Sequence, residues 1–453
     1  MSELKIIARH SATVLVGQLA VISFGIADTL IAGRYSPQAL AVLSLASSIY
    51  ISIYVALNGL MQALLPVWAE LHGAGRQEAL GRSVRQALYI AAAAVLVGMA
   101  CLWFPDPWLS STQVPVELWP DVRAYLRILA LALVPSLLFR MYSTLNQSLG
   151  LPRLVTWLQA GALLVKVPLS YVLTFGIAGS PALGIVGCAW ATLVVNALML
   201  VTGVWLLRSR DIYQNYQLWR RPEAPDWPVI RRFLRLGIPA GLSIMVEVTS
   251  FTLMALFIAR LGAVALASHQ IATSMAALLY MVPLSLGIAS SARTGYWLGA
   301  GQARKARDAA GLGIGLAIGM ALFNAGLLYF GRETLAKAFS TDPQVVQAAS
   351  LWLAWVALYH LADSVQAVCA FLLRCYRITL MPLLVYTALL WGAGLYGGLR
   401  LAHHGIDFLG WPMRPQVDTF WMTSTAALAL VSVIFVVRVW QATQASLPPA
   451  SAA

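Results

Sequence analysis

Charged side chains are scarce in this sequence. Only 10% of its 453 residues are Asp, Glu, Lys or Arg, whereas 60% are hydrophobic. Soluble globular proteins carry about 25% charged residues, so the composition excludes both an ordinary water-soluble domain and a disordered chain. It is the composition of a membrane protein.

Cysteines are few, and the common catalytic motifs are absent. The four cysteines fall in apolar segments, without the spacing of a disulfide framework or a zinc site. There is no phosphate-binding G-x-x-x-x-G-K loop, no H-E-x-x-H and no G-x-S-x-G. We therefore expect neither an enzyme nor a cofactor, and we expect any transport to run on an ion gradient without ATP. The cysteines are Cys101, Cys188, Cys369 and Cys375.

Apolar runs long enough to cross about 30 Å of hydrocarbon occur twelve times. They predict an all-α membrane protein with twelve transmembrane helices, because a helix satisfies its own backbone hydrogen bonds in lipid. The first run lacks a cleavage signature and is expected to stay as an anchor. The predicted spans are 10–33, 41–71, 85–104, 123–149, 154–176, 184–207, 233–260, 264–298, 308–330, 345–373, 379–401 and 418–438.

The distribution of Lys and Arg predicts the orientation in the membrane. With the N-terminus in the cytoplasm, twenty of the thirty basic residues lie on the cytoplasmic side and eight on the outer side. The remaining two, Arg140 and Lys166, lie inside spans. Both termini are therefore expected in the cytoplasm. The excess of Lys and Arg on the cytoplasmic side accounts for the net charge of +13, so a nucleic-acid partner is not needed to explain that charge.

Two short repeats indicate tandem halves. Ala39-Leu40-Ala41 recurs as Ala265-Leu266-Ala267, and Gly73-Ala74-Gly75 recurs as Gly299-Ala300-Gly301, both 226 residues later. Six spans per half give the halves the same orientation, related by a pseudo-two-fold axis along the membrane normal, with a site at their interface. The predicted domains are a six-helix lobe at 1–207, a cytoplasmic linker at 208–232, a second lobe at 233–441 and a disordered tail at 442–453.

Two carboxylates lie deep inside the predicted spans of the second lobe. Glu247 follows Arg235 by twelve residues and Asp363 precedes Arg374 by eleven, which puts both about 16–18 Å from the cytoplasmic end of their helices. Two close carboxylates in low dielectric take up a proton or hold a cation between them, as a coupling-ion site requires. Tyr359, one turn from Asp363, is a further candidate ligand. The alternative is a shared-proton pair that only joins two helices.

The first lobe carries one buried acid and two buried bases. Asp28 is a candidate for coupling or substrate binding, together with Lys166 and with Ser170 one turn further on. A purely structural Asp28–Lys166 ion pair is the alternative. Arg140 lies too deep for its side chain to reach the interface easily. The candidates for the substrate cleft are Arg140, Gln270 and His360.

Four stretches together resemble the multidrug and toxic compound extrusion (MATE) family, most closely its NorM-type bacterial branch. The resemblance covers nearly the whole chain. It implies two six-helix lobes that form a V, sodium- or proton-driven antiport, and a cation site at Glu247, Asp363 and Tyr359. Asp28 matches the acidic residue of the family's first helix. The stretches are IADTLIAGRYSPQALAVLSLASSIY, FLRLGIPAGLSIMVEVTSFTLMAL, ALASHQIATSMAALLYMVPLSLGIASSARTGYWLG and ALYHLADSVQAVCAFLLRCYR.

Four residues depart from the family pattern. Lys166 and Ser170 stand where the family has asparagines or similar oxygen donors, and an ammonium cannot ligate sodium. Thr13 replaces a proline of the first helix, which removes a hinge there. Arg140 stands where NorM-type relatives carry an uncharged polar residue.

Together with the composition, this resemblance implies a monomeric, cation-coupled antiporter of a bacterial inner membrane that exports small amphiphilic, mostly cationic compounds. Sodium and protons both remain candidates for the coupling ion, and Glu247 and Asp363 are the candidate ligands for Na⁺. A flippase for lipid-linked precursors is the alternative within transport, with Arg140 and Lys166 as hints. An intramembrane enzyme or a channel is the alternative from another class.

Overall fold

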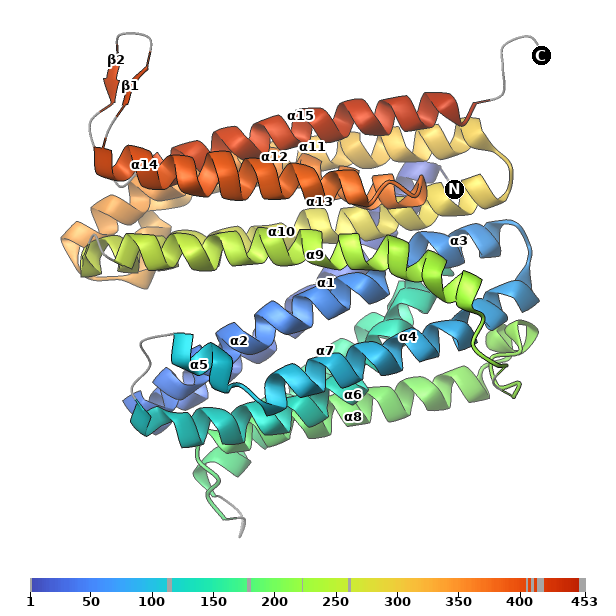
Figure 1. Ribbon diagram of the computed structural model, residues 1–453, viewed down its shortest axis with the longest axis horizontal. Helices are drawn as coiled ribbons and strands as arrows, with labels where there is room; N and C mark the ends of the chain where they lie inside the picture. The colour runs from blue at the N-terminus through green and yellow to red at the C-terminus, as the bar shows by residue number, and fades with distance from the viewer. Residues whose placement is uncertain are drawn as a thin grey trace. The chain divides into compact units, whose positions relative to one another are not determined.

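The computed structural model describes residues 2–111, 116–176, 181–221, 223–259, 262–404, 406–408, 411–413 and 419–447 (Figure 1). Within these residues, twelve helical segments are long and apolar enough to cross a membrane. All twelve coincide with the runs predicted from hydropathy, so the predicted all-α class and the number of spans are confirmed. One short β-hairpin, outside the spans, was not expected.

The chain divides into two compact units that do not follow the predicted lobe limits at 207 and 233. The N-terminal unit is Ala12–Gly241, and the C-terminal unit combines Met1–Ser11 with Leu242–Ala453. The predicted linker 208–232 therefore belongs to the N-terminal unit, and α9 (Trp227–Ala259) passes from one unit to the other after Gly241.

The N-terminal unit is built around α6. This helix packs against α8, α4, α2 and α7, and it is the most buried span of its unit. The elements are α1 (Glu3–Tyr35) from Ala12 onward, α2 (Pro37–Gln62), α3 (Leu65–Gly73), α4 (Gln77–Trp103), α5 (Asp106–Ser111), η1 (Val116–Leu118), α6 (Trp119–Ser148), α7 (Pro152–Phe175), α8 (Val186–Ser209) and η2 (Asp211–Tyr216).

The C-terminal unit is built around α12, which packs against α10, α11 and α15 and is the most buried of the twelve spans. Its core includes Trp352, Tyr359, Phe420 and Trp421. The elements are α10 (Ala263–Gly299), α11 (Ala303–Phe339), α12 (Pro343–Cys375), α13 (Leu380–Tyr386), η3 (Thr387–Tyr396), α14 (Gly397–His404), β1 (Ile406–Phe408), β2 (Trp411–Met413) and α15 (Thr419–Ala445).

The first turn of the chain is fixed within the C-terminal unit. Glu3 accepts two hydrogen bonds from the guanidinium of Arg293, at 3.0 and 2.5 Å. Ile7 is fully buried and packs with Ala289 and Ala309. This ion pair and this contact explain why residues 1–11 group with the second half of the chain.

Two predicted spans are interrupted. The run 41–71 breaks into α2 and α3 near Ala63, because Pro66 lacks a backbone N–H and is best placed in the first turn of a new helix. The run 379–401 contains η3, a π-helical segment in which the hydrogen bonds are one residue longer. Hydropathy reports the length of a span and not its hydrogen-bond register, so neither interruption was predicted.

The C-terminal end of the chain is more helical than predicted. α15 continues to Ala445, so residues 442–445 are helical although no structure was expected from 442 onward. Residues 448–453 of the predicted tail lie outside the described residues.

The repeated Gly-Ala-Gly turns adopt the same conformation. Gly75 and Gly301 both have positive φ, +68° and +71°, a region that favours glycine. Their backbone hydrogen bonds also correspond. The N–H of Gly75 donates to the carbonyl of His72, and the N–H of Gly301 donates to the carbonyl of Leu298. The turns thus occupy equivalent places, between α3 and α4 and between α10 and α11.

Candidate functional site

The two deep carboxylates of the C-terminal unit are brought together by one amide. Gln366 Nε2 donates to Glu247 Oε1 at 2.9 Å and to Asp363 Oδ1 at 3.0 Å. The two acceptor oxygens therefore lie within two hydrogen-bond lengths of each other. Glu247 on α9 is 7% exposed, Asp363 on α12 is 4% and Gln366 is fully buried. The prediction that these acids meet inside one unit is confirmed.

Gln366 is itself held by Tyr386. The phenol of Tyr386, at the end of α13, donates to Gln366 Oε1, which turns the amide nitrogen toward the carboxylates. We call Glu247, Asp363, Gln366 and Tyr386 the acidic cluster. Sequence reasoning missed the last two: Gln366 lies three residues after Asp363 on the same helix face, a usable signal, whereas Tyr386 depends on tertiary packing and left none.

Neither carboxylate of the acidic cluster forms an ion pair with Lys or Arg among the described residues. Arg374, the one Lys or Arg of α12, attracts Glu247 electrostatically without forming an ion pair with it, and its guanidinium lies 4.4 Å from the centre of the Phe371 ring. A buried, unpaired carboxylate costs several kcal/mol. The cluster is therefore suited to binding a proton or a small cation.

Tyr359 lies one turn before Asp363 and packs within an aromatic group. Its ring meets Phe251 and Trp421 edge-on, with centroids 5.8 and 5.9 Å apart. His269 packs on Trp421 in the same group, at 5.8 Å. The structure thus places Tyr359 in the apolar wall beside the acidic cluster.

The first-lobe candidates form a second buried site. Lys166 Nζ lies 2.8 Å from both Asp28 Oδ1 and Asp28 Oδ2, and 2.9 Å from Ser170 Oγ. The Ser170 hydroxyl in turn donates to Asp28 Oδ1 at 3.0 Å. The possible Asp28–Lys166 salt bridge is therefore present. The carbonyl of Cys188, 3.1 Å from Nζ, completes the site, and no side-chain pattern predicted it.

The three cleft candidates are not brought to either site by a hydrogen bond or ion pair of the described residues. Arg140 on α6 is 7% exposed, and its Nη1 has no hydrogen-bond partner in the described part of the chain. His360 Nε2 lies 3.3 Å from Ser364 Oγ and 3.5 Å from Asn324 Nδ2. Gln270 is exposed on α10.

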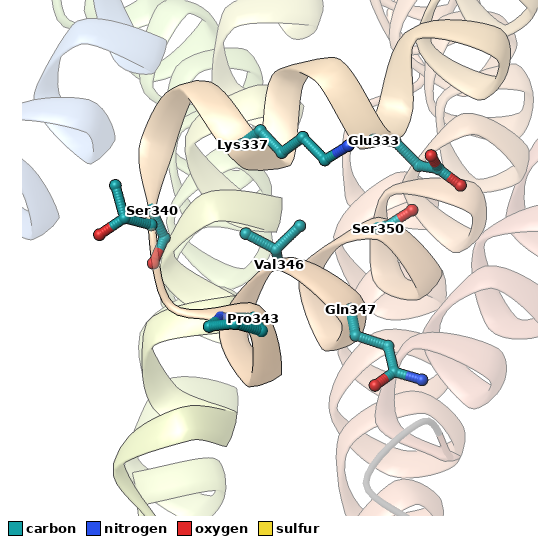
Figure 2. Close-up of a pocket in the computed structure, with 8 residues that line it drawn as sticks. Glu333, Lys337, Ser340, Pro343, Val346, Gln347 and Ser350 are labelled. Atoms are coloured by element: carbon teal, nitrogen blue, oxygen red, sulfur yellow. The ribbon is translucent and has the colours of Figure 1, made fainter.

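A cavity of about 600 Å³ lies where α11 ends and α12 begins (Figure 2). Its lining residues include Glu333 and Lys337 of α11 and Val346, Gln347 and Ser350 of α12, and Val346 points toward α11 (Figure 2). None of the candidate residues above lines this cavity, so it is a feature separate from both buried sites.

The family assignment follows from two matches along the chain. The family model MatE matches residues 14–172 and matches again at 239–395. The chain belongs to the MatE family. The starts of the two matches reproduce the offset of about half the chain that the short repeats predicted. Members of this family are secondary transporters, so the chain is a multi-pass membrane transporter and not an enzyme.

The relatives agree with this assignment. The chain is 38% identical over 426 residues to the "Probable multidrug resistance protein NorM" of Aromatoleum aromaticum, covering 94% of this chain and 91% of the relative. It is 35% identical to the "Multidrug resistance protein PmpM" of Pseudomonas aeruginosa, covering 88% and 84%. The crystal structure of the eukaryotic MATE transporter AtDTX14 superposes with a TM-score of 0.85 at 17% identity, covering 98% and 99%. The fold is the MATE fold.

Proposed function

We propose that this transporter is a cation-coupled antiporter that exports amphiphilic, mostly cationic compounds across a bacterial inner membrane. The acidic cluster is the observation that carries the proposal. Two carboxylates share a single neutral amide inside an apolar unit, and their charge has to be offset by a proton or a bound Na⁺. Intramembrane acids of this kind mark ion pathways.

In this proposal Glu247 and Asp363 hold the coupling ion, and Tyr359 lines the site beside them. Binding of the ion neutralises the cluster and its release restores the charge, so the two states differ in their preferred conformation. No resident cofactor takes part. Asp28, Lys166 and Ser170 serve the first lobe in a coupling- or substrate-linked role, and Arg140, Gln270 and His360 contact the substrate.

The proposed setting is a monomer with both termini in the cytoplasm. It rests on the excess of Lys and Arg on one side of the predicted spans. It also rests on the bacterial relatives named as multidrug resistance proteins.

A lipid-linked-precursor flippase is the second candidate, and Arg140 favours it. A buried guanidinium whose Nη1 has no partner among the described residues is suited to a phosphate or carboxylate of a substrate. An antiporter for simple cations has no evident use for such a group.

Uptake of ethidium into inverted membrane vesicles tests the proposal, with sodium and pH gradients imposed separately. We expect saturable uptake under one of the two gradients, and none with ATP when ionophores collapse both gradients. An uptake rate that is independent of both gradients, or that does not saturate with ethidium concentration, would exclude a coupled antiporter and favour a channel.

A further inference from the structure

The ammonium of Lys166 is enclosed by oxygen atoms from three helices. Asp28 of α1 supplies two carboxylate oxygens, Ser170 of α7 a hydroxyl and Cys188 of α8 a carbonyl, all within 2.8–3.1 Å of Nζ. Lys166 and Ser170 are fully buried, and Asp28 is 7% exposed. A dry shell of carboxylate, hydroxyl and carbonyl oxygens is also the environment in which proteins hold dehydrated monovalent cations.

The hydrogen bonds of this shell are complete. An ammonium has three protons, and the shell offers three kinds of acceptor: the carboxylate, the hydroxyl and the carbonyl. The Ser170 hydroxyl accepts from Lys166 and donates to Asp28 Oδ1, so it is used in both directions. One positive and one negative charge cancel. The site is therefore satisfied without any ion from solution.

The backbone brings the carbonyl within reach. A Cβ at Gly187 would lie 2.6 Å from the carbonyl carbon of Leu173, so only glycine lets α8 approach α7 this closely. The contact between Thr174 Oγ1 and Cys188 Sγ, at 3.4 Å, holds the same two helices one residue further on. The oxygen shell is thus built into the packing of α7 on α8, and it does not depend on the lysine side chain alone.

We propose that Asp28, Ser170 and the Cys188 carbonyl form a monovalent-cation site in which the Lys166 ammonium is the built-in occupant. The N-terminal unit then takes up no cation from solution. If the lysine side chain is shortened, the vacated shell accepts Na⁺ or a small primary ammonium ion. The proposed site concerns cation binding by the N-terminal unit, so a negative binding result would leave the proposed transport function unaffected.

The test is equilibrium binding to the purified full-length protein, with ²²Na⁺ and ¹⁴C-methylammonium as the probes. Lys166→Ala should bind one more cation per chain than the wild type, and its melting temperature should rise with the concentration of that cation. The gain should be absent from Lys166→Ala combined with Asp28→Asn. Lys166→Met is the matched control: it removes the charge but keeps the side-chain volume, so the shell stays filled and no binding is gained.

Equal binding by Lys166→Ala and by the double variant would overturn the proposal, because the oxygen shell would then have no affinity of its own. A second measurement does not require the alanine variant to fold. Asp28→Asn combined with Lys166→Met, which leaves no buried charge and keeps the shell filled, should bind as many Na⁺ ions as the wild type. Loss of a bound Na⁺ from this double variant would show that the native N-terminal unit does take up the ion, and the built-in occupant would be disproved.

Discussion

The two buried sites differ in how the charge of their carboxylates is compensated. Asp28 is neutralised by Lys166, with both carboxylate oxygens 2.8 Å from the ammonium. Glu247 and Asp363 share only the neutral amide of Gln366. Removing one partner of a buried pair leaves an uncompensated charge, whereas removing both does not. This difference gives a test at the level of single side chains.

Asp28→Asn should destabilise the folded protein by roughly 3–5 kcal/mol, because it leaves the Lys166 ammonium buried without its counter-charge. Asp28→Asn combined with Lys166→Asn should be clearly more stable than Asp28→Asn alone, since no buried charge remains. Thermal unfolding of the wild type, both single variants and the double variant in detergent gives the coupling energy. If the double variant is no more stable than Asp28→Asn, the two side chains are not energetic partners.

The sequence raised this ion pair only as an alternative, and part of its surroundings went unpredicted. An acid and a base that both lie inside apolar spans favour such a pair, but sequence alone does not say which helices are neighbours. Cys188 was missed, since a backbone carbonyl carries no side-chain signature. Tyr386 was missed for a related reason, because its partner Gln366 lies on another helix.

At the scale of elements, the segment after α8 is held against α4. Arg85 donates to Glu223 at 2.7 Å and to the carbonyl of Gln217, also at 2.7 Å, and Arg82 lies 3.0 Å from Asp226. The backbone N–H of Asp226 donates to Gln86 at 2.8 Å. We call residues 217–226 the strap. These contacts explain why the predicted linker belongs to the N-terminal unit.

The strap should loosen as the pH falls. The hydrogen bond from Arg85 lowers the pKa of Glu223 below its usual value. A lowered pKa means that the carboxylate stabilises the strap at neutral pH, and that this contribution is lost as the pH falls through the lowered value. Hydrogen exchange of peptides covering 217–226, corrected for the intrinsic rate, should therefore accelerate in acid.

Glu223→Gln should accelerate exchange in the strap at pH 7 by roughly two- to fivefold, as expected for a partly exposed ion pair. It should also flatten the pH dependence. Glu117→Gln, at an exposed acid in η1, is the control and should leave the strap unchanged. If Glu223→Gln exchanges like the control at every pH, the carboxylate does not hold the strap.

Hydropathy predicted where helices occur and not how they are interrupted. All twelve spans were found because about twenty apolar residues are needed to cross the bilayer. The break near Pro66 and the π-helical η3 were missed because they depend on local hydrogen bonding. In η3, Trp391 donates to the carbonyl of Val246 at 3.1 Å, a contact with α9 that no pattern within the span indicates.

At the scale of the whole molecule, the chain is a tandem repeat whose two halves differ in the charged groups that they bury. The family model matches twice, and the Gly75 and Gly301 turns share one conformation. The N-terminal unit buries a neutral ion pair, whereas the C-terminal unit buries two acids that form no ion pair with Lys or Arg among the described residues. We therefore propose that the C-terminal unit holds the coupling ion, and that Asp28 and Lys166 act in a substrate-linked role.

The most direct test is gradient-driven ethidium uptake by inverted vesicles carrying equal amounts of each variant. Glu247→Gln and Asp363→Asn should each lower uptake by at least about tenfold, because the group whose charge changes during the cycle is gone. Asp28→Asn combined with Lys166→Asn should keep measurable uptake, since it removes a neutral pair. Wild-type uptake by both C-terminal variants, or loss of uptake only in the N-terminal double variant, would contradict the account.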